Sequence, residues 1–249
     1  MRNELKRRLK RGEQVYGTWI TLESPMAAEM MSTLGFDYFV FDTEHSPLGI
    51  YQAQTLMQAM RGDTTTPIVR AWWNDIVAIK RALDIGAYGV VVPWVNNREQ
   101  AELAVKATRY APKGLRGCGP RRASMFDPDY YQTVDEEILV ICQIETEEAV
   151  ENIDDIVSVE GVDVSYIGPA DLSASYGHLG NQSHPNVQEA IDRVYDATKA
   201  AGKAAGIHMG SGKTIEERIK KGYNLITIGN DLTYLKKGVL EQRKRLGLD

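Results

Sequence analysis

Several apolar, strand-like runs of this sequence end in side chains that could do chemistry. A carboxylate, imidazole, guanidinium or carboxamide group stands at or just after the end of these runs, and the residues are Asp42, Glu44, His45, Arg70, Gln143, Glu145, Asp171 and His208. In α/β barrels the carboxyl ends of the strands meet at one face, where catalytic groups are placed. The pattern predicts an enzyme with one metal ion between two carboxylates, a histidine base and an arginine.

Glu145 and Asp171 are the predicted metal ligands. Two carboxylates, completed by water and a chelating substrate, suit an octahedral oxygen site for Mg²⁺ or Mn²⁺, with Co²⁺ or Zn²⁺ as further candidates. The alternative is that each acid caps the helix that follows it, because acids favour helix N-termini. Their position on adjacent predicted strands, beside Gln143 and Gly168, favours the metal.

His45 is the predicted acid–base group, since a histidine titrates near neutrality. Asp42 stands three residues earlier. We expect it to orient the imidazole ring, so that the two residues form a dyad. The alternative is a surface-loop histidine without a catalytic role.

Arg70 ends an apolar run, where an unpaired charge would be costly to bury. We therefore expect it to meet either an internal acid or an anionic substrate. A fixed donor of this kind, aimed at a forming enolate oxygen, is worth about 3 kcal/mol of barrier. Trp19, at the end of the first run, either walls the same pocket or belongs to the core.

The motif GPAD comprises Gly168, Pro169, Ala170 and Asp171 and leads from a strand into a helix. Backbone amides at such a helix start could bind a carboxylate. The motif alone is weak evidence for a site.

Two other mechanisms are disfavoured. No lysine ends a predicted strand, so a Schiff-base mechanism lacks its nucleophile. The segment GIHMGSGKT resembles a phosphate-binding loop, but that motif requires a glycine where Ile207 stands. Gly210 and Gly212 could still shape an anion-binding turn.

Composition restricts the partners. The net charge of −5 gives no general attraction to nucleic acid or anionic membranes. No apolar stretch approaches the roughly 20 residues that span a bilayer. Cys118 and Cys142 lack metal-like spacing and favour a reducing cytoplasm. We expect a small-molecule substrate, with neither nucleic acid nor membrane as a partner.

Eight β-rich runs alternate with amphipathic stretches along the chain. The runs are VYGTWI, FDYFVFD, PIVRA, GVVVPWV, LVICQIE, VSYIGP, AAGIHM and LITIGND. Several helices are expected to begin at a capping residue (Ser24, Asn74, Asn97) and to end at glycine. In 249 residues this alternation matches a (β/α)8 TIM barrel better than an open doubly wound sheet.

We predict a single barrel domain over residues 1–249. The basic N-terminal segment, with Leu5 and Leu9 one helical turn apart, is expected to form a helix that caps the barrel floor. Residues 112–131, PKGLRGCGPRRASMFDPDYY, are rich in glycine and arginine and are expected to form a loop over the active-site face.

These motifs resemble the HpcH/HpaI family of metal-dependent pyruvate aldolases. The matching text is GFDYFVFDTEHSP, VRAWWND, KATRYAPKGLRG, QIET, EGVDVSYIGPADLS and a late GND, spread from about Val15 to Leu235. The resemblance implies a barrel of the phosphoenolpyruvate/pyruvate-domain type. It also implies a homohexamer, a dimer of trimers, in which a C-terminal helix is exchanged between subunits.

The resemblance also implies a reaction. A 4-hydroxy-2-oxo acid, such as 4-hydroxy-2-oxoheptanedioate or a 2-keto-3-deoxy sugar acid, is cleaved reversibly to pyruvate and an aldehyde through an enolate stabilised by the metal. Glu145 and Asp171 carry over as metal ligands, and Arg70 carries over as the clamp on pyruvate and its enolate.

The remaining roles also follow from the resemblance. His45, paired with Asp42, becomes the base that works through a metal-bound water. The pyruvyl group is held by Gln143 and by the backbone of Gly168, Pro169 and Ala170.

Two departures from the family pattern concern the aldehyde. The segment GCGPRRASMF is shorter than usual and places Arg121 beside Arg122. His208 stands where an apolar residue is expected, and a polar donor there suggests a hydroxylated aldehyde. Two alternative functions stay open. One is the same enolate chemistry with a hydroxypyruvate or citryl-CoA-like donor, and the other is a non-catalytic protein that binds an oxo acid.

Overall fold

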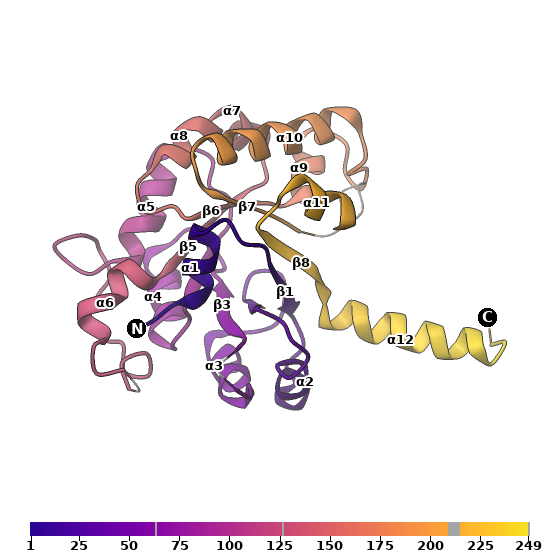
Figure 1. Ribbon diagram of the computed structural model, residues 1–249, viewed down its shortest axis with the longest axis horizontal. Helices are drawn as coiled ribbons and strands as arrows, with labels where there is room; N and C mark the ends of the chain where they lie inside the picture. Colours follow the sequence, from indigo (N-terminus) through magenta and orange to yellow (C-terminus); the bar gives the residue numbers. More distant parts are fainter. Residues whose placement is uncertain (63, 126, 209–214, 249) are drawn as a thin grey trace.

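The computed structural model describes residues 1–62, 64–125, 127–208 and 215–248, in which eight parallel strands close into a barrel (Figure 1). Each strand pairs with its neighbours in chain order, and the last returns to the first. The strands are β1 (Val15–Ile20), β2 (Tyr38–Asp42), β3 (Thr66–Arg70), β4 (Gly89–Val92), β5 (Leu139–Ile144), β6 (Val164–Ile167), β7 (Ala204–Ile207) and β8 (Leu225–Asn230). Each overlaps one predicted run, so the predicted (β/α)8 barrel is confirmed.

Helices surround the barrel and connect its strands (Figure 1). Within the described residues they are α1 (Glu4–Lys10), α2 (Pro25–Met31), α3 (Ile50–Ala59), α4 (Ile76–Asp84), α5 (Arg98–Thr108), α6 (Tyr130–Glu137), α7 (Glu147–Glu151), α8 (Ile153–Ser158), α9 (Pro169–Ser175), α10 (Pro185–Ala200), α11 (Ile215–Lys221) and α12 (Asp231–Arg245). None of these helices is long and apolar enough to cross a bilayer. The turn expected at Gly210 and Gly212 lies outside the described residues.

The helix caps follow the sequence closely, with one exception. Ser24 and Asn97 accept hydrogen bonds from the first turns of α2 and α5, as predicted. The prediction for Asn74 is wrong, because Asp75 caps α4 by accepting from two amide groups of its first turn. Asn74 instead donates to the carbonyl of Gln100, 3.0 Å away. Neighbouring capping residues compete for one helix start, and the tertiary contact decides between them.

The barrel interior is closed at one end by α1. Leu5 and Leu9 of this helix are buried in the same apolar cluster as Val15 and Tyr38 from the barrel. Lys6 forms an ion pair of 2.9 Å with Asp163, the residue just before β6. The helix therefore covers the amino-terminal ends of the strands.

Residues 112–125 and 127–131 also lie at this amino-terminal end, so the predicted loop over the active-site face is wrong. Arg116 forms a 2.8 Å ion pair with Asp84 at the end of α4, and Arg122 donates to the carbonyl of Ile85. The physical reason is the direction of the chain, since a segment between a helix and the next strand must return to the start of that strand. Arg121 and Arg122 therefore belong to a segment at the floor.

Glycines on two strands make room for large rings inside the barrel. Gly17 pairs with Tyr38 across β1 and β2, and Gly206 pairs with Tyr166 across β6 and β7. A Cβ atom on either glycine would overlap the neighbouring tyrosine ring. Both tyrosines are fully buried. Small and large residues therefore alternate around the barrel so that its interior is filled.

The last helix, α12, extends away from the barrel (Figure 1, yellow). Its apolar residues Leu235, Val239 and Leu240 are more than half exposed, at 59%, 53% and 52%. Apolar side chains exposed together on one helix are typical of an interaction site.

The pairing of Gly17 with Tyr38 predicts the effect of an added methyl group. We expect Gly17→Ala to lower the free energy of unfolding by about 1–3 kcal/mol, because overpacking forces a buried ring from its position. The free energy is measured by urea unfolding. Gly238→Ala is the control, since a Cβ there meets nothing within 4 Å. An equal loss in both variants would contradict the packing argument.

Candidate active site

A cavity of about 190 Å³ opens at the carboxyl ends of the strands. Its lining comes from the ends of seven strands and the segments that follow them, and comprises Trp19, Thr21, Asp42, His45, Arg70, Gln143, Gly168, Pro169, Ala170, Asp171, His208 and Asn230. Every site residue predicted from the sequence lines this cavity except Glu145, which lies directly beside it. The structure therefore brings the predicted residues together.

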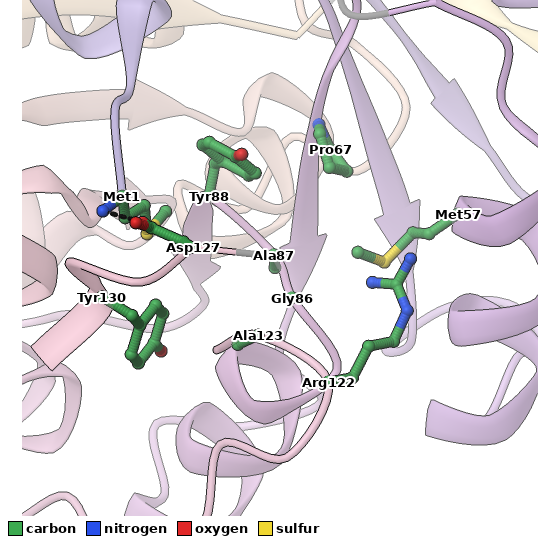
Figure 2. Close-up of a pocket in the computed structure, with 10 residues that line it drawn as sticks. All are labelled: Met1, Met57, Pro67, Gly86, Ala87, Tyr88, Arg122, Ala123, Asp127 and Tyr130. Atoms are coloured by element: carbon green, nitrogen blue, oxygen red, sulfur yellow. Dashed lines mark ion pairs between the residues drawn. The ribbon is translucent and has the colours of Figure 1, made fainter. Parts of the chain in front are cut away.

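A second cavity, of about 200 Å³, lies at the opposite end of the barrel. Figure 2 shows its lining, which includes Tyr88, Arg122 and an ion pair between the Met1 ammonium group and Asp127. None of the predicted catalytic, substrate-binding or metal-binding residues lines it. The cavity at the carboxyl ends is therefore the candidate active site.

The guanidinium group of Arg70 is fixed by two acids and a ring. Its Nε and Nη2 donate to the Asp42 carboxylate at 3.0 and 2.6 Å. Its Nη1 lies 3.1 Å from Oε2 of Glu44. The group also lies over the Trp19 ring, 4.3 Å from the ring centroid. Arg70 thus meets internal acids, which was one of the two expected partners. Trp19 belongs to the buried core and also forms part of the cavity wall.

These contacts act differently on the two acids. Burial alone would raise the pKa of Asp42, but the hydrogen bonds and charge of Arg70 outweigh burial and hold that pKa below its usual value. For Glu44, burial is the larger effect, and its pKa is raised despite the charge of Arg70. Asp42 is therefore the permanent counter-ion of the arginine.

The predicted contact between the His45 ring and Asp42 is not formed. The Asp42 carboxylate accepts from Arg70 and from the backbone N–H groups of Glu44 and His45, at 3.0 and 3.1 Å. The His45 side chain is 60% exposed, and its Nε2 lies 3.9 Å from Oε1 of Glu44. The reason is that a buried cation satisfies Asp42 more strongly than a ring at the surface does. His45 therefore stands at the rim of the cavity, beside Glu44.

Three further residues belong to the site, and the sequence pattern had assigned a role to none of them. Glu44 touches Arg70, and Thr21 and Asn230 line the cavity. All three stand at or just past the end of a strand, so the rule that found the other residues could have found them. Asp231, another strand-end acid, has a structural role, since it accepts from the backbone of Thr21 and Leu22 at 2.8 Å each.

Glu145 is buried and held from both sides. Its Oε1 accepts from the backbone N–H of Trp94 at 2.9 Å, and its Oε2 accepts from Nε2 of Gln143 at 2.6 Å. Trp94 has a φ of 54°, which is rare for a non-glycine residue and indicates strain stored at the site. A Cβ atom on Gly168 would come within 2.8 Å of Oε2, so only glycine lets the backbone approach this closely.

Among the residues that the structure describes, no positive group balances the charge of Glu145. Burial raises the pKa of Glu145 to about 7, and the charges of Asp171 and Glu44 add to this effect. The hydrogen bond from Trp94 and the charge of Arg70 oppose it only in part. A cation beside Glu145 and Asp171 would remove this imbalance.

The donor atoms fit a divalent cation with oxygen ligands. Asp171 stands in the first turn of α9 but has no hydrogen-bond or ion-pair partner within the described chain, and Glu145 is held by Trp94 and Gln143. Neither acid therefore makes a capping hydrogen bond. Oε1 of Gln143 is buried and accepts no hydrogen bond there. No group of three or more histidine, cysteine, aspartate or glutamate side chains is arranged for a metal in the described ranges. The arrangement therefore fits a two-carboxylate site completed by water and substrate.

His208 lies directly after β7, against the Trp19 ring, with the ring centroids 5.0 Å apart and nearly perpendicular. Its Nδ1 is 3.3 Å from the hydroxyl of Tyr166. Burial lowers the pKa of His208 to about 4, and the nearby charge of Arg70 adds to this effect. The ring is therefore neutral at physiological pH.

Comparison with known proteins gives consistent matches. The model of the HpcH/HpaI aldolase/citrate lyase family matches residues 15–237. The chain is 43% identical over 242 residues to the 4-hydroxy-2-oxo-heptane-1,7-dioate aldolase of Klebsiella pneumoniae. The alignment covers 96% of this chain and 91% of that protein.

Solved structures match equally broadly. A HpcH/HpaI aldolase/citrate lyase family protein from Burkholderia cenocepacia J2315 is 35% identical with a TM-score of 0.92, covering 98% of this chain and 99% of that chain. The citrate synthase SbnG is 32% identical with a TM-score of 0.86, again covering 98% and 99%.

The raised pKa of Glu145 predicts how Glu145→Gln affects the metal-free protein. In the unfolded chain this carboxyl ionises near its ordinary pKa of 4.5, and in the folded chain near about 7. The folded state therefore binds the extra proton, and the wild type loses stability as the pH rises through this range, whereas the glutamine variant does not. In EDTA, the unfolding temperature of the variant minus that of the wild type should rise between about pH 5 and about pH 8.

Glu147→Gln serves as the control, because Glu147 is exposed and stands two residues further along the chain. Its difference from the wild type should stay constant with pH. A constant difference for Glu145→Gln would contradict the assignment.

Proposed function

The chain belongs to the HpcH/HpaI aldolase/citrate lyase family and is a carbon–carbon lyase, and on this basis we propose that it is a divalent-metal aldolase. Its reaction is the reversible cleavage of a 4-hydroxy-2-oxo acid to pyruvate and an aldehyde. One observation carries the proposal: a fixed arginine and a pair of acids meet at one cavity, beside a rim histidine. The aldolase from Klebsiella pneumoniae supports this substrate class.

Glu145 and Asp171 are the proposed ligands of the cation, which is Mg²⁺ or Mn²⁺ in our proposal. When bound, the cation would supply a Lewis acid and a template for the 2-oxo acid. The strained Trp94 and the amide of Gln143 keep the Glu145 carboxylate in place. Such supporting contacts orient ligands before the ion binds.

Arg70 would bind the oxygen atom on which negative charge develops. Asp42 uses two of its N–H groups and Glu44 lies beside Nη1, which leaves donors for the cavity. Because the guanidinium group is fixed by Asp42, Glu44 and Trp19, it need not reorganise during the reaction. The amide of Gln143 and the backbone at residues 168–170 would hold the pyruvyl group.

His45 would take the proton of the 4-hydroxyl group, directly or through one water molecule. As this proton leaves, a C=O bond forms at C4 and the C3–C4 bond breaks. Its electron pair passes to the pyruvyl half as an enolate, and the aldehyde departs. Protonation of the enolate at C3 gives pyruvate, and synthesis is the reverse. The exposed position of His45 lets it exchange the proton with solvent.

The similarity to the citrate synthase SbnG favours a second candidate function. In that case the same site would form or cleave a citrate-like acid, with a different enolate donor. A hydroxypyruvate or citryl-CoA-like donor belongs to the same group of alternatives.

We also propose that the chain is cytoplasmic and forms a homohexamer, a dimer of trimers, in which α12 packs on a neighbouring copy. The exposed Leu235, Val239 and Leu240 support this, because few groups of the same chain cover them. Burial against a second copy would remove their apolar surface from water.

The enolate can be tested without knowing the aldehyde. We expect the protein to exchange the methyl hydrogens of pyruvate for deuterium in the presence of Mn²⁺ or Mg²⁺, as followed by NMR. EDTA should abolish the exchange, and Arg70→Ala should slow it by about 100-fold or more, because a fixed donor to the enolate oxygen is lost. Exchange with hydroxypyruvate but not with pyruvate would favour the second candidate. No exchange with either would favour a binding protein.

The oligomer is tested at α12. The double variant Leu235→Ser, Val239→Ser should lower the molar mass in solution, as measured by light scattering after size-exclusion chromatography, because two apolar contacts one turn apart are lost. Lys236→Ser, Lys237→Ser on the same helix is the matched control and should keep the wild-type mass. A wild-type mass for both variants would contradict the role of α12.

A further inference from the structure

Beneath the cavity, three hydroxyl groups form a chain inside the barrel. The hydroxyl of Tyr38 lies 3.2 Å from Oγ1 of Thr227, and that atom lies 2.5 Å from the hydroxyl of Tyr166. The Tyr166 hydroxyl in turn lies 3.3 Å from Nδ1 of His208. Tyr38, Thr227 and Tyr166 are at most 1% exposed. The chain therefore runs through the buried core and ends on His208, which lines the cavity.

The direction of these hydrogen bonds follows from counting protons. Each hydroxyl has one proton, and burial raises the pKa values of Tyr38 and Tyr166, so both phenols stay protonated. Thr227 is the one acceptor within reach of the Tyr38 hydroxyl in the described part of the chain. Tyr38 must therefore donate to Thr227, since a buried hydroxyl without an acceptor costs free energy.

The rest of the chain is then determined. In the described part of the chain, Oγ1 of Thr227 has hydrogen-bond contacts only with Tyr38, Tyr166 and the N–H of Trp19. Since Tyr38 and Trp19 act as donors, the proton of Thr227 can go only to Tyr166, and the proton of Tyr166 then goes to Nδ1 of His208. The indole N–H of Trp19 can only donate, and it lies 3.3 Å from the Tyr166 hydroxyl and 3.2 Å from Oγ1 of Thr227. It therefore adds a donor to these oxygens and takes no proton from them. The opposite direction would leave the proton of Tyr38 without an acceptor.

This order of donors selects one tautomer of His208. Because Nδ1 accepts, a neutral ring carries its proton on Nε2. The ring is neutral because burial and the charge of Arg70 lower its pKa to about 4. Nε2 has no hydrogen-bond partner among the residues that the structure describes, and the ring lines the cavity. His208 thus presents an uncharged N–H donor at the cavity wall.

The described lining of the cavity contains one permanent cation, Arg70, which is already paired with acids. A second carboxylate on the aldehyde half would find no ionic partner in that part of the wall. An uncharged hydroxyl, in contrast, would find the N–H donor of His208. We propose that His208 determines the specificity of the site for aldehydes with a hydroxyl group next to the carbonyl carbon, and that Tyr38, Thr227 and Tyr166 are positioning residues that hold its Nε2–H tautomer. This inference rests on the proposed aldolase reaction.

The test compares two acceptors of nearly equal size, glycolaldehyde and propanal, which differ by a hydroxyl group in place of a methyl group. Each is condensed with pyruvate in the presence of Mn²⁺, and the ratio of the two kcat/KM values is measured. We expect the wild type to favour glycolaldehyde and His208→Leu to lower the ratio by about tenfold, as loss of one hydrogen bond implies. His208→Gln keeps an N–H donor close to the position of Nε2 and should restore much of the ratio.

The positioning role of Tyr166 is tested by measuring the tautomer of His208. In protein labelled with ¹⁵N-histidine, the NMR spectrum should show His208 with the proton on Nε2 and an unprotonated Nδ1. Tyr166→Phe removes the donor to Nδ1, so it should mix the tautomers and lower the acceptor ratio. Tyr223→Phe is the matched control, since Tyr223 is equally buried but lies outside the chain, and it should change neither quantity.

The outcomes distinguish the proposed aldolase reaction from the role of His208. If the wild type does not exchange pyruvate deuterium, the proposed function fails. If exchange is present but His208→Leu keeps the wild-type ratio, or the spectrum shows the proton on Nδ1, the inference about His208 is overturned while the aldolase stands.

Discussion

The buried guanidinium group of Arg70 is the constraint on which the site depends. Asp42 and Arg70 are register partners on the neighbouring strands β2 and β3, so the sheet itself brings the two charges together. Leaving either charge unpaired in the barrel would cost several kcal/mol. This pairing fixes the start of the loop after β2, places Glu44 beside the arginine, and leaves His45 at the rim. The positions of these side chains thus follow from the need to pair one buried charge.

The opposite side of the cavity has the reverse charge. Glu145 is buried with a pKa near 7, and Asp171 lies close enough to raise it. The fold maintains this unfavourable arrangement with the backbone N–H of a strained Trp94 and with the glycine at position 168. A cavity with a paired cation on one wall and under-compensated acids on the other suits a ligand that has both negative oxygens and a bound cation. The cost in stability is concentrated where chemistry is expected.

Beneath these walls, buried side chains of the barrel interior support the groups that line the cavity. Gly17 and Gly206 make room for Tyr38 and Tyr166, whose hydroxyl groups meet at Thr227. A purely apolar core would fill the same volume but would leave the orientation of the rings above it open. The same tyrosines therefore fill the centre of the barrel and form the hydrogen bonds beneath the cavity.

The sequence by itself determined the eight strands and therefore which residues stand at their carboxyl ends. Apolar runs, caps and turns are local signals, and barrel topology then gathers Arg70, Gln143 and Asp171 at one face. The sequence did not determine the partners of these groups. That Asp42 pairs with Arg70, and that residues 112–125 and 127–131 lie at the floor, depends on strand register and chain direction. Contacts between residues far apart in the chain are decided only when the barrel closes, because each charge or hydroxyl then takes the best partner within reach.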